Sequence, residues 1–229
     1  MKEGFWVEPI AHIETDYKEK FGIPRQSGTV KGKGRIVFLP KYRNPDALRE
    51  IEGFSHLWLI FDFSLAHRDE WSPTVRPPRL GGNRRVGVFA SRSPYRPNPI
   101  GLSCVRLVCV EHSESEGDVL VVEGADLLCG TPIIDIKPYL PFADSKADAK
   151  GGYAEQMRDY ALSVFIPEEQ KERLSEERLA ALTEILSEDP RPSYQDDENR
   201  VYHMSFGEYE VDFCVKGGVA EVKEIREKA

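Results

Sequence analysis

The stretch that decides the fold class is "GLSCVRLVCVEHSESEGDVLVVEGADLL", residues 101–128. It holds two runs rich in valine and leucine, 101–112 and 118–128, and the polar stretch between them ends at Gly117. Short apolar, β-branched runs that are bounded by turn residues are typical of strands. The stretch therefore predicts two strands and favours a β-rich fold.

Further runs of this kind surround the quoted stretch, and they lie at 5–15, 34–40, 54–63, 85–91 and 131–140. In the first two thirds of the chain only "NPDALREIEG", residues 44–53, indicates a helix, with Asn44 as its N-cap and Pro45 in its first turn. Several short strands with turn signals favour a sandwich or a small barrel over a doubly wound fold.

A smaller unit is expected after a change of composition at residues 143–156, which are polar and rich in alanine and glycine, as in a linker. The elements expected beyond it are a strand at 160–167, a helix at 175–190 with Ser175 as N-cap, and strands at 200–206, 209–215 and 219–225. We therefore expect two domains, a mainly β domain at 1–146 and a small α+β domain at 147–229.

Composition excludes several classes of protein. The chain is 40% hydrophobic and 31% charged, and it has no run of about 18 apolar residues and no apolar secretory signal. Four cysteines form no CxxC pair and no zinc-like cluster, so we interpret them as reduced thiols and expect a cytoplasmic protein with no metal and no membrane partner. Neither GxGxxG nor a P-loop motif is present, and the five histidines are interpreted as structural or surface residues.

Charge is distributed very unevenly along the chain. The net charge is −8, yet residues 71–110 contain seven arginines and no Asp, Glu or Lys; they carry +7, so the remainder carries −15. Arginine favours bidentate recognition of carboxylates and phosphates, so this window indicates a site for an anionic ligand. The alternative is a belt of solvated arginines on the surface.

The segment "ASRSPYRPNPIGLS", residues 90–103, interrupts the strands with three prolines. Proline fixes φ and restrains the residue before it, so the segment should hold one shape before any ligand binds. Arg92 and Arg96 flank Tyr95, which offers a stacking face. We interpret the segment as a preformed anionic-ligand site beside an aromatic; the alternative is a loop that covers a sheet edge.

In "IIDIKPY", residues 133–139, Asp135 and Lys137 are two positions apart and should share one face of a strand, with the isoleucines packed on the other. The two charges either neutralise each other or line a pocket. The pattern leaves both possibilities open.

Five motifs together carry a resemblance to a known family. They are "GIPRQSG" (22–28), "GFSHLWLIFDF" (53–63), the arginine-rich stretch 71–103, "DLLCGTPIIDIKPYLPFADS" (126–145) and "DPRPSY" (189–194). In this order they resemble the TrmO (YaeB-like) family of bacterial tRNA N6-methyltransferases, densely over residues 5–146 and more loosely beyond. The resemblance implies a non-Rossmann β-barrel that binds S-adenosylmethionine, a C-terminal domain that assists tRNA binding, and a homodimer. It also implies methylation of N6 of threonylcarbamoyladenosine at position 37, in the anticodon loop.

The resemblance also implies particular site residues. The expected cofactor contacts are Pro24, Arg25, Gln26, Ser64, Leu65, Arg92, Leu102, Glu123, Gly124, Ala125 and Asp126. The expected substrate contacts are Arg76, Arg79, Arg84, Tyr95, Arg96, Lys137 and Arg191. Relatives often carry histidine where this chain has Ser64, and His67 lies three residues further on.

Arg92 is also expected to serve catalysis, and Asp135 and Tyr139 are alternative candidates for the base that takes the N6 proton. Two other interpretations stay open. One is a barrel that binds S-adenosylmethionine or a nucleotide without turnover, and the other is a methyltransferase with a different substrate.

Overall fold

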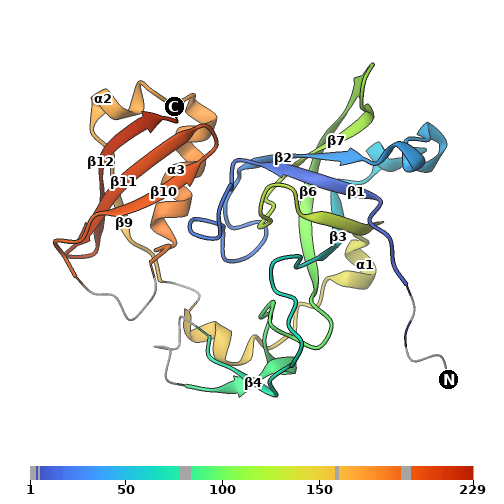
Figure 1. Ribbon diagram of the computed structural model, residues 1–229, viewed down its shortest axis with the longest axis horizontal. Helices are drawn as coiled ribbons and strands as arrows, with labels where there is room; N and C mark the ends of the chain where they lie inside the picture. Colours follow the sequence, from blue (N-terminus) through green and yellow to red (C-terminus); the bar gives the residue numbers. More distant parts are fainter. Residues whose placement is uncertain (1–3, 5, 78–83, 158–159, 192–196, 229) are drawn as a thin grey trace.

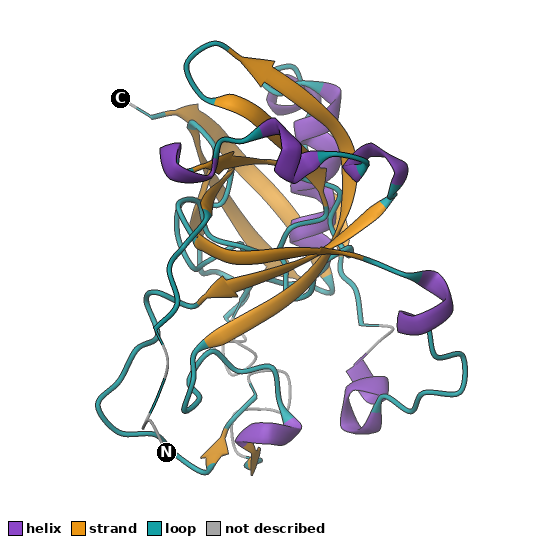
Figure 2. Cartoon of the chain, turned by 90° about the vertical axis from the view of Figure 1, so that its right-hand side faces the viewer, coloured by secondary structure: helices purple, strands orange, loops and turns teal. Residues whose placement is uncertain are grey.

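A computed structural model of the chain describes residues 4, 6–77, 84–157, 160–191 and 197–228 (Figure 1). Strands make up most of its body, and apart from one longer helix the helices are short and lie at the periphery (Figure 2). Among the described residues, no helix combines the length and the apolar character needed to cross a membrane.

The N-terminal part of the chain forms a closed antiparallel β-barrel. Its strands are β1 (Ala11–Thr15), β2 (Lys33–Phe38), β3 (His56–Asp62), β6 (Ile100–Ser113), β7 (Gly117–Glu123) and β8 (Pro132–Pro138). Their order around the barrel is β1-β2-β7-β6-β3-β8, and pairing of Ala11 with Ile133 closes it. Of the sandwich and the barrel that the strand pattern allowed, the structure shows the barrel, as the family resemblance implied.

Inward-pointing side chains, which alternate with outward-pointing ones along each strand, fill the barrel interior. On β3, Leu57, Leu59 and Phe61 are buried and point inward, with the residues between them on the outer face. Gly101 of β6 pairs with Phe61, and a Cβ atom built there would lie 2.1 Å from the phenyl ring. Glycine at position 101 therefore leaves room for the ring that closes one end of the core.

The helix predicted at residues 44–53 is wrong in kind. The structure instead has three 3₁₀ helices after β2: η1 (Pro40–Tyr42), η2 (Pro45–Leu48) and η3 (Ile51–Gly53). Asn44 does cap the second, since its side chain accepts a hydrogen bond from the Asp46 amide. Glu50 has a left-handed backbone conformation with φ of 69°, which ends the helical turn between η2 and η3.

The C-terminal part is a four-stranded sheet packed with helix α3 (Glu176–Ser187). Its order is β10 (Tyr202–Phe206), β11 (Tyr209–Lys216), β12 (Val219–Glu227) and β9 (Ser163–Phe165), and only the last pair is parallel. The predicted N-cap is confirmed, because Ser175 accepts from the Arg178 amide, and α3 buries Leu182, Ile185 and Leu186. A short helix, α2 (Glu168–Lys171), precedes α3.

A third part, below the barrel in Figure 1, consists of short elements. The strand predicted at 85–91 is shorter than expected: β5 (Val86–Gly87) pairs with β4 (Thr74–Val75), and η5 (Val88–Ala90) follows. The expected linker contains the end of α1 (Pro141–Asp144) and η6 (Gly152–Met157), and the Tyr153 hydroxyl donates to the Ala90 carbonyl at 2.9 Å. This linker therefore packs against the arginine-rich part of the chain.

The loop between β1 and β2 joins the barrel to the C-terminal sheet. Tyr17 and Val30, near its two ends, belong to the same buried cluster as α3 and strands β10 to β12. Figure 1 shows the loop reaching toward that sheet. The C-terminal core is therefore completed by side chains from the N-terminal part.

Candidate active site

A cavity of about 880 Å³ lies at one end of the barrel. Four segments line it: residues 20–26 of the β1–β2 loop, 61–66 at the end of β3, 91–103 from the proline segment into β6, and 126–131 after β7. We call it the main cavity. Each segment contains one of the sequence motifs, so the fold brings together residues that are far apart in the chain.

The proline segment forms one wall of the main cavity and is braced along its length. The amide of Phe63 donates to the carbonyl of Pro99 at 2.7 Å, which ties the segment to the end of β3. The Arg96 guanidinium donates back to the Ser91 carbonyl at 3.2 Å, and the amide of Arg96 donates to the Pro94 carbonyl at 3.0 Å. These hydrogen bonds tie the segment to the end of β3 and to its own turn.

Arg92 connects the proline segment to the β1–β2 loop. Its Nη1 lies 2.6 Å from Oε1 of Gln26, so two predicted cofactor contacts touch each other at the cavity wall. The neighbouring Arg25 turns the other way: its Nη2 donates to the carbonyl oxygens of Asp189 at 2.5 Å and Arg191 at 3.1 Å. Arg25 therefore anchors this loop to the C-terminal part.

Asp126 places a carboxyl group inside the main cavity. The hydroxyl of the buried Ser103 donates to its Oδ1 at 2.5 Å. Burial raises the pKa of Asp126, against the opposing effects of the Ser103 hydrogen bond, backbone amides and the positive charge of Arg92. A carboxyl group held in this way is suited to accept a hydrogen bond from an amine or hydroxyl of a ligand.

The remaining lining of the main cavity is largely apolar. Leu65 and Leu102 are exposed into it, although apolar side chains of this size are commonly buried. The Phe61 and Phe63 rings meet edge to face nearby, with centroids 4.9 Å apart. An apolar pocket with a few converging polar groups is the usual form of a small-molecule site.

Three of the expected cofactor contacts lie outside the main cavity. Ala125 is buried in the barrel core, and Glu123 pairs with Arg106 at 3.5 Å. Gly124 has φ of 88° and its carbonyl accepts from the amide of Gly28 at 2.8 Å. Gly124 and Ala125 therefore set the course of the chain that delivers Asp126 to the cavity.

The candidate bases Asp135 and Tyr139 also lie outside the main cavity. Asp135 forms an ion pair with Lys137 at 2.8 Å and also lines a second cavity of about 400 Å³, so the structure shows the neutralised pair and, for Asp135, a place in a pocket lining as well. Ile133 is buried in the barrel core and Ile136 is partly buried against it, because the β3–β8 register skips Ile134 and so interrupts the simple alternation. Tyr139 packs against Trp58, with ring centroids 5.7 Å apart.

The expected substrate contacts are spread over the molecule. Tyr95 and Arg96 line the main cavity, and the guanidinium of Arg68 lies 3.8 Å from the centroid of the Tyr95 ring. Arg76 and Arg84 are exposed beside β4 and β5, whereas Arg79 lies outside the described residues.

Arg191 is placed differently from the other arginines. Its side chain is only 9% exposed, and it pairs with Asp189 through Nε at 2.8 Å and Nη2 at 3.0 Å. Tyr160 donates to the same carboxylate at 2.7 Å. The Arg191 guanidinium, which was expected to contact a tRNA phosphate, is therefore paired with a carboxylate of the C-terminal part.

Some lining residues were missed by the sequence analysis. Asp62 lines the main cavity, and its Oδ1 lies 2.7 Å from Nε2 of His67, which is not part of the lining. Ser64 is exposed in the turn before it. An Asp and a His five residues apart form no motif that predicts a contact. Whether their side chains meet depends on the turn between them, which the sequence does not predict.

Metal ligands do not gather in the described parts of the chain, where no group of three His, Cys, Asp or Glu could hold an ion, and all four cysteines are free thiols. The arrangement of the main cavity instead suits an organic ligand that carries both charged and apolar groups.

Comparison with known proteins agrees with this arrangement. The family model "tRNA-methyltransferase O N-terminal domain" matches residues 12–145, and "TrmO C-terminal domain" matches residues 159–228. The tRNA (adenine(37)-N6)-methyltransferase of Escherichia coli is 44% identical over 230 residues, which cover 95% of this chain and 96% of that protein.

Similarity to Pseudomonas aeruginosa proteins is found in both sequence and structure. A protein provisionally named an S-adenosylmethionine-dependent methyltransferase is 42% identical over 205 residues, covering 84% of each chain. A crystal structure of TrmO from the same species superposes with a TM-score of 0.80 at 32% identity, covering 99% of both chains. With both domain models matched and the fold shared over its whole length, the chain belongs to the tRNA-methyltransferase O (TrmO) family.

Proposed function

We propose that this protein transfers a methyl group from S-adenosylmethionine to N6 of threonylcarbamoyladenosine at position 37 in the anticodon loop of tRNA, in the cytoplasm. The observation that carries the proposal is the main cavity, where Asp126 and Arg92 converge on an apolar pocket at the end of a barrel. Family membership and the similarity to a tRNA (adenine(37)-N6)-methyltransferase support methylation of N6 at position 37, and the similarity to an S-adenosylmethionine-dependent methyltransferase supports the methyl donor.

The residues of the main cavity fit this donor. Arg92 is suited to its carboxylate and Asp126 to its ammonium group or ribose hydroxyls, because charge-assisted hydrogen bonds are the stronger ones. Leu65 and Leu102 offer apolar surface to the adenine ring of the donor. The cavity volume of about 880 Å³ is within the usual range for a small-molecule site. Pro24 and Gln26 line the same cavity and would also contact the donor.

When bound, the donor supplies an electrophilic methyl group on a positively charged sulfur. The protein holds the two reactants in line in a braced pocket, and such positioning can contribute about 7–11 kcal/mol toward the barrier. The threonyl carboxylate and the tRNA phosphates are anionic, and the exposed arginines Arg76 and Arg84 are suited to them.

A base is needed as well, because N6 must lose a proton when it gains the methyl group. Asp62 lines the main cavity and contacts the exposed His67, which gives the proton a path to solvent. Asp135 lines the other cavity, and Tyr139 packs against Trp58 without being part of the lining of the main cavity. We therefore favour Asp62 over the two candidates from the sequence.

A homodimer is part of the proposal. Val108 is exposed on the outer face of β6, the face on which Ile100 and Leu102 line the main cavity. This exposed apolar side chain supports an interface on that face, since exposed apolar surface marks contact sites. Sedimentation velocity of the protein and of the Val108→Asp variant tests it: the proposal expects a dimer that the variant weakens.

The reaction itself is tested with unmodified protein, labelled S-adenosylmethionine and tRNA that carries threonylcarbamoyladenosine. Nucleoside analysis should then show label in the N6-methylated nucleoside. Calorimetry of the donor alone separates the alternatives. Donor that binds but is never consumed favours a binding module, label in another nucleoside favours a different substrate, and no binding at all contradicts the proposed site.

A further inference from the structure

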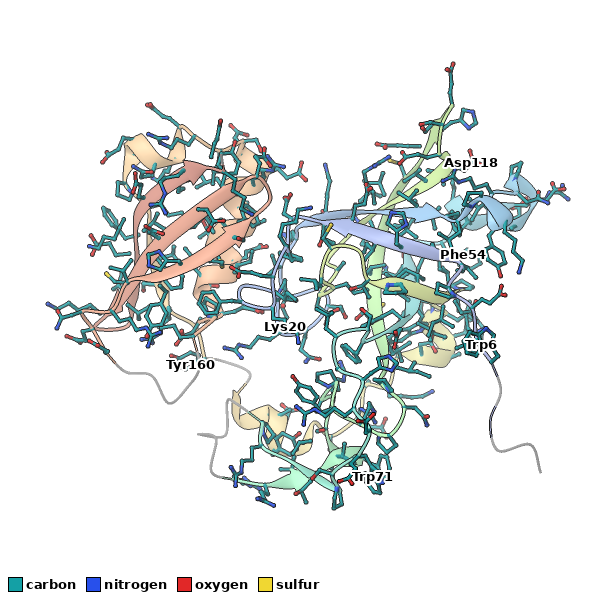
Figure 3. The ribbon with its side chains drawn as sticks, in the orientation of Figure 1. Trp6, Lys20, Phe54, Trp71, Asp118 and Tyr160 are labelled. Carbon is teal, nitrogen blue, oxygen red and sulfur yellow. The ribbon has the colours of Figure 1, made fainter. Side chains whose placement is uncertain are left out.

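Trp71 and Phe89 form an aromatic pair on the surface of the molecule. Their rings are stacked with centroids 6.2 Å apart and planes at 28°, although Trp71 is 55% and Phe89 is 74% exposed. Figure 3 shows Trp71 on the part of the chain that carries β4 and β5, at the foot of the molecule. Two large rings that stack on each other and remain this exposed leave faces and edges available to a ligand.

The pair is held in place before any ligand arrives. Thr74 pairs with Gly87 and Val75 with Val86, and the amide of Val88 donates to the Pro73 carbonyl at 3.0 Å. Val88 is buried and fixes the short helix η5 on which Phe89 stands. Because the backbone on both sides is fixed, the rings need little further ordering to bind a planar group.

Phe89 also lines the main cavity, so the aromatic pair lies at its mouth. Tyr95 lines the same cavity and carries the Arg68 guanidinium on its ring. A polymer whose one unit enters the cavity would therefore pass its neighbouring units over Trp71 and Phe89.

The charges around the aromatic pair indicate which kind of polymer would bind there. Arg76, Arg84 and Arg85 are exposed on the strands β4 and β5 or next to them. No acidic residue occurs from position 71 to 110, and the acidic pair Asp69–Glu70 marks where this stretch begins. Exposed aromatics beside arginines suit single-stranded nucleic acid, in which unpaired bases stack and phosphates need cations.

We propose that Trp71 and Phe89 form a stacking platform for an unpaired base that neighbours the target nucleotide in the anticodon loop. The inference rests on the proposed function and extends it, because it assigns these two side chains a role in holding the loop open beside the cavity. A second copy of this chain that docked through the same face is a weaker occupant, since it would bring another Arg76, Arg84 and Arg85 against these three exposed arginines.

The test uses the full-length protein without methyl donor and a fluorescein-labelled anticodon stem–loop RNA, titrated by fluorescence anisotropy. Trp71→Ala and Phe89→Ala should each weaken binding by about tenfold, the effect of losing one base–aromatic stack. Trp71→Phe keeps a stacking face and should stay within about twofold of the wild type. Phe142→Ala removes an even more exposed ring, on α1, and should change nothing.

A fully paired RNA of the same length separates stacking from phosphate attraction. The proposal expects its affinity to be unchanged in all four variants. Equal loss for paired and unpaired RNA, or no loss for either, would overturn it, provided that circular dichroism and thermal melting show folded variants. A shift from dimer to monomer in sedimentation, with unchanged RNA affinity, would assign the pair to a subunit contact instead.

Because no donor is present, this titration is independent of the proposed reaction. Failure of donor binding in calorimetry contradicts the proposed function and leaves the RNA result intact. Failure of the RNA titration contradicts the stacking platform alone.

Discussion

Nη2 of Arg25 donates to the carbonyl oxygen of Asp189 at 2.5 Å, which joins the loop of the main cavity to the turn after α3. The amide of Arg25 also donates to the Glu188 carboxylate at 3.0 Å. Asp189 has a left-handed backbone with φ of 54°, which is uncommon for a residue other than glycine. This turn is therefore held in an unfavourable conformation by the groups that surround it.

Replacement of Arg191 distinguishes a structural role from a role in tRNA binding. Because Arg191→Ala leaves the Asp189 carboxylate without its bidentate partner, we expect a loss of about 3–5 kcal/mol in the free energy of unfolding. Urea unfolding measures it. Arg200→Ala is the matched control, since that guanidinium also lies over the Tyr202 ring, at 5.2 Å, but is exposed. Unchanged stability with weaker tRNA binding would instead make Arg191 a substrate contact.

Arg92→Ala should weaken binding of the methyl donor by about 10- to 100-fold, because hydrogen bonds to charged groups contribute ~1.5–3 kcal/mol. It also removes the partner of Gln26. Calorimetry with S-adenosylmethionine measures the effect, and Arg49→Ala, an exposed arginine paired only within its own turn, should bind as the wild type does. Wild-type affinity in the Arg92 variant would exclude it from the donor site.

Asp126 should make stability depend on pH in an unusual direction. Its folded-state pKa is raised by burial, so the folded protein binds a proton that the unfolded chain releases above its ordinary pKa of about 3.9. The stability of the wild type relative to Asp126→Asn should therefore be greatest near pH 4 and fall as pH rises through the raised pKa. Urea unfolding of both proteins from pH 4 to pH 8 checks this. A difference that grows with pH would mean that the carboxylate is stabilised by the fold.

Gly101→Ala should destabilise the barrel by about 1–3 kcal/mol, since the added methyl group would collide with the Phe61 ring. Phe61→Leu in the same chain should recover part of the loss by making room. Gly53→Ala is the control, because a Cβ there has no neighbouring atom within 4 Å and should change stability by less than about 0.5 kcal/mol. Equal losses of stability at both positions would show that the effect comes from reduced backbone freedom and not from a collision with the Phe61 ring.

Local patterns predicted the strands well, because alternation and turn residues are properties of neighbours in the chain. They failed at residues 44–53, where a helix-like composition is overruled by the left-handed Glu50. They also failed at Ile134, which the register shift between β3 and β8 skips, so that Ile133 is buried in the barrel core and Ile136 is partly buried against it.

The candidate site depended on longer-range information. Motif resemblance placed Gln26, Arg92 and Asp126 in one site, and the fold brings them to the walls of one cavity. The burial of Arg191 could not be seen in the sequence, because its partner Asp189 looks like an ordinary turn residue there. The contact between Asp62 and His67, and the stacking of Trp71 on Phe89, likewise depend on how loops return on themselves.

The loop between β1 and β2 affects the order in which the parts of the molecule can fold during synthesis. One side of it lines the main cavity, and Tyr17 and Val30 pack into the core shared with β12, which is translated last among the strands. The strands of the barrel can pair while the rest of the chain is still being translated. The β1–β2 loop, which forms one wall of the cavity, has no C-terminal core to pack against until β12 has been synthesised. The pocket of a nascent chain can therefore be completed only after every strand of the barrel beneath it has been synthesised.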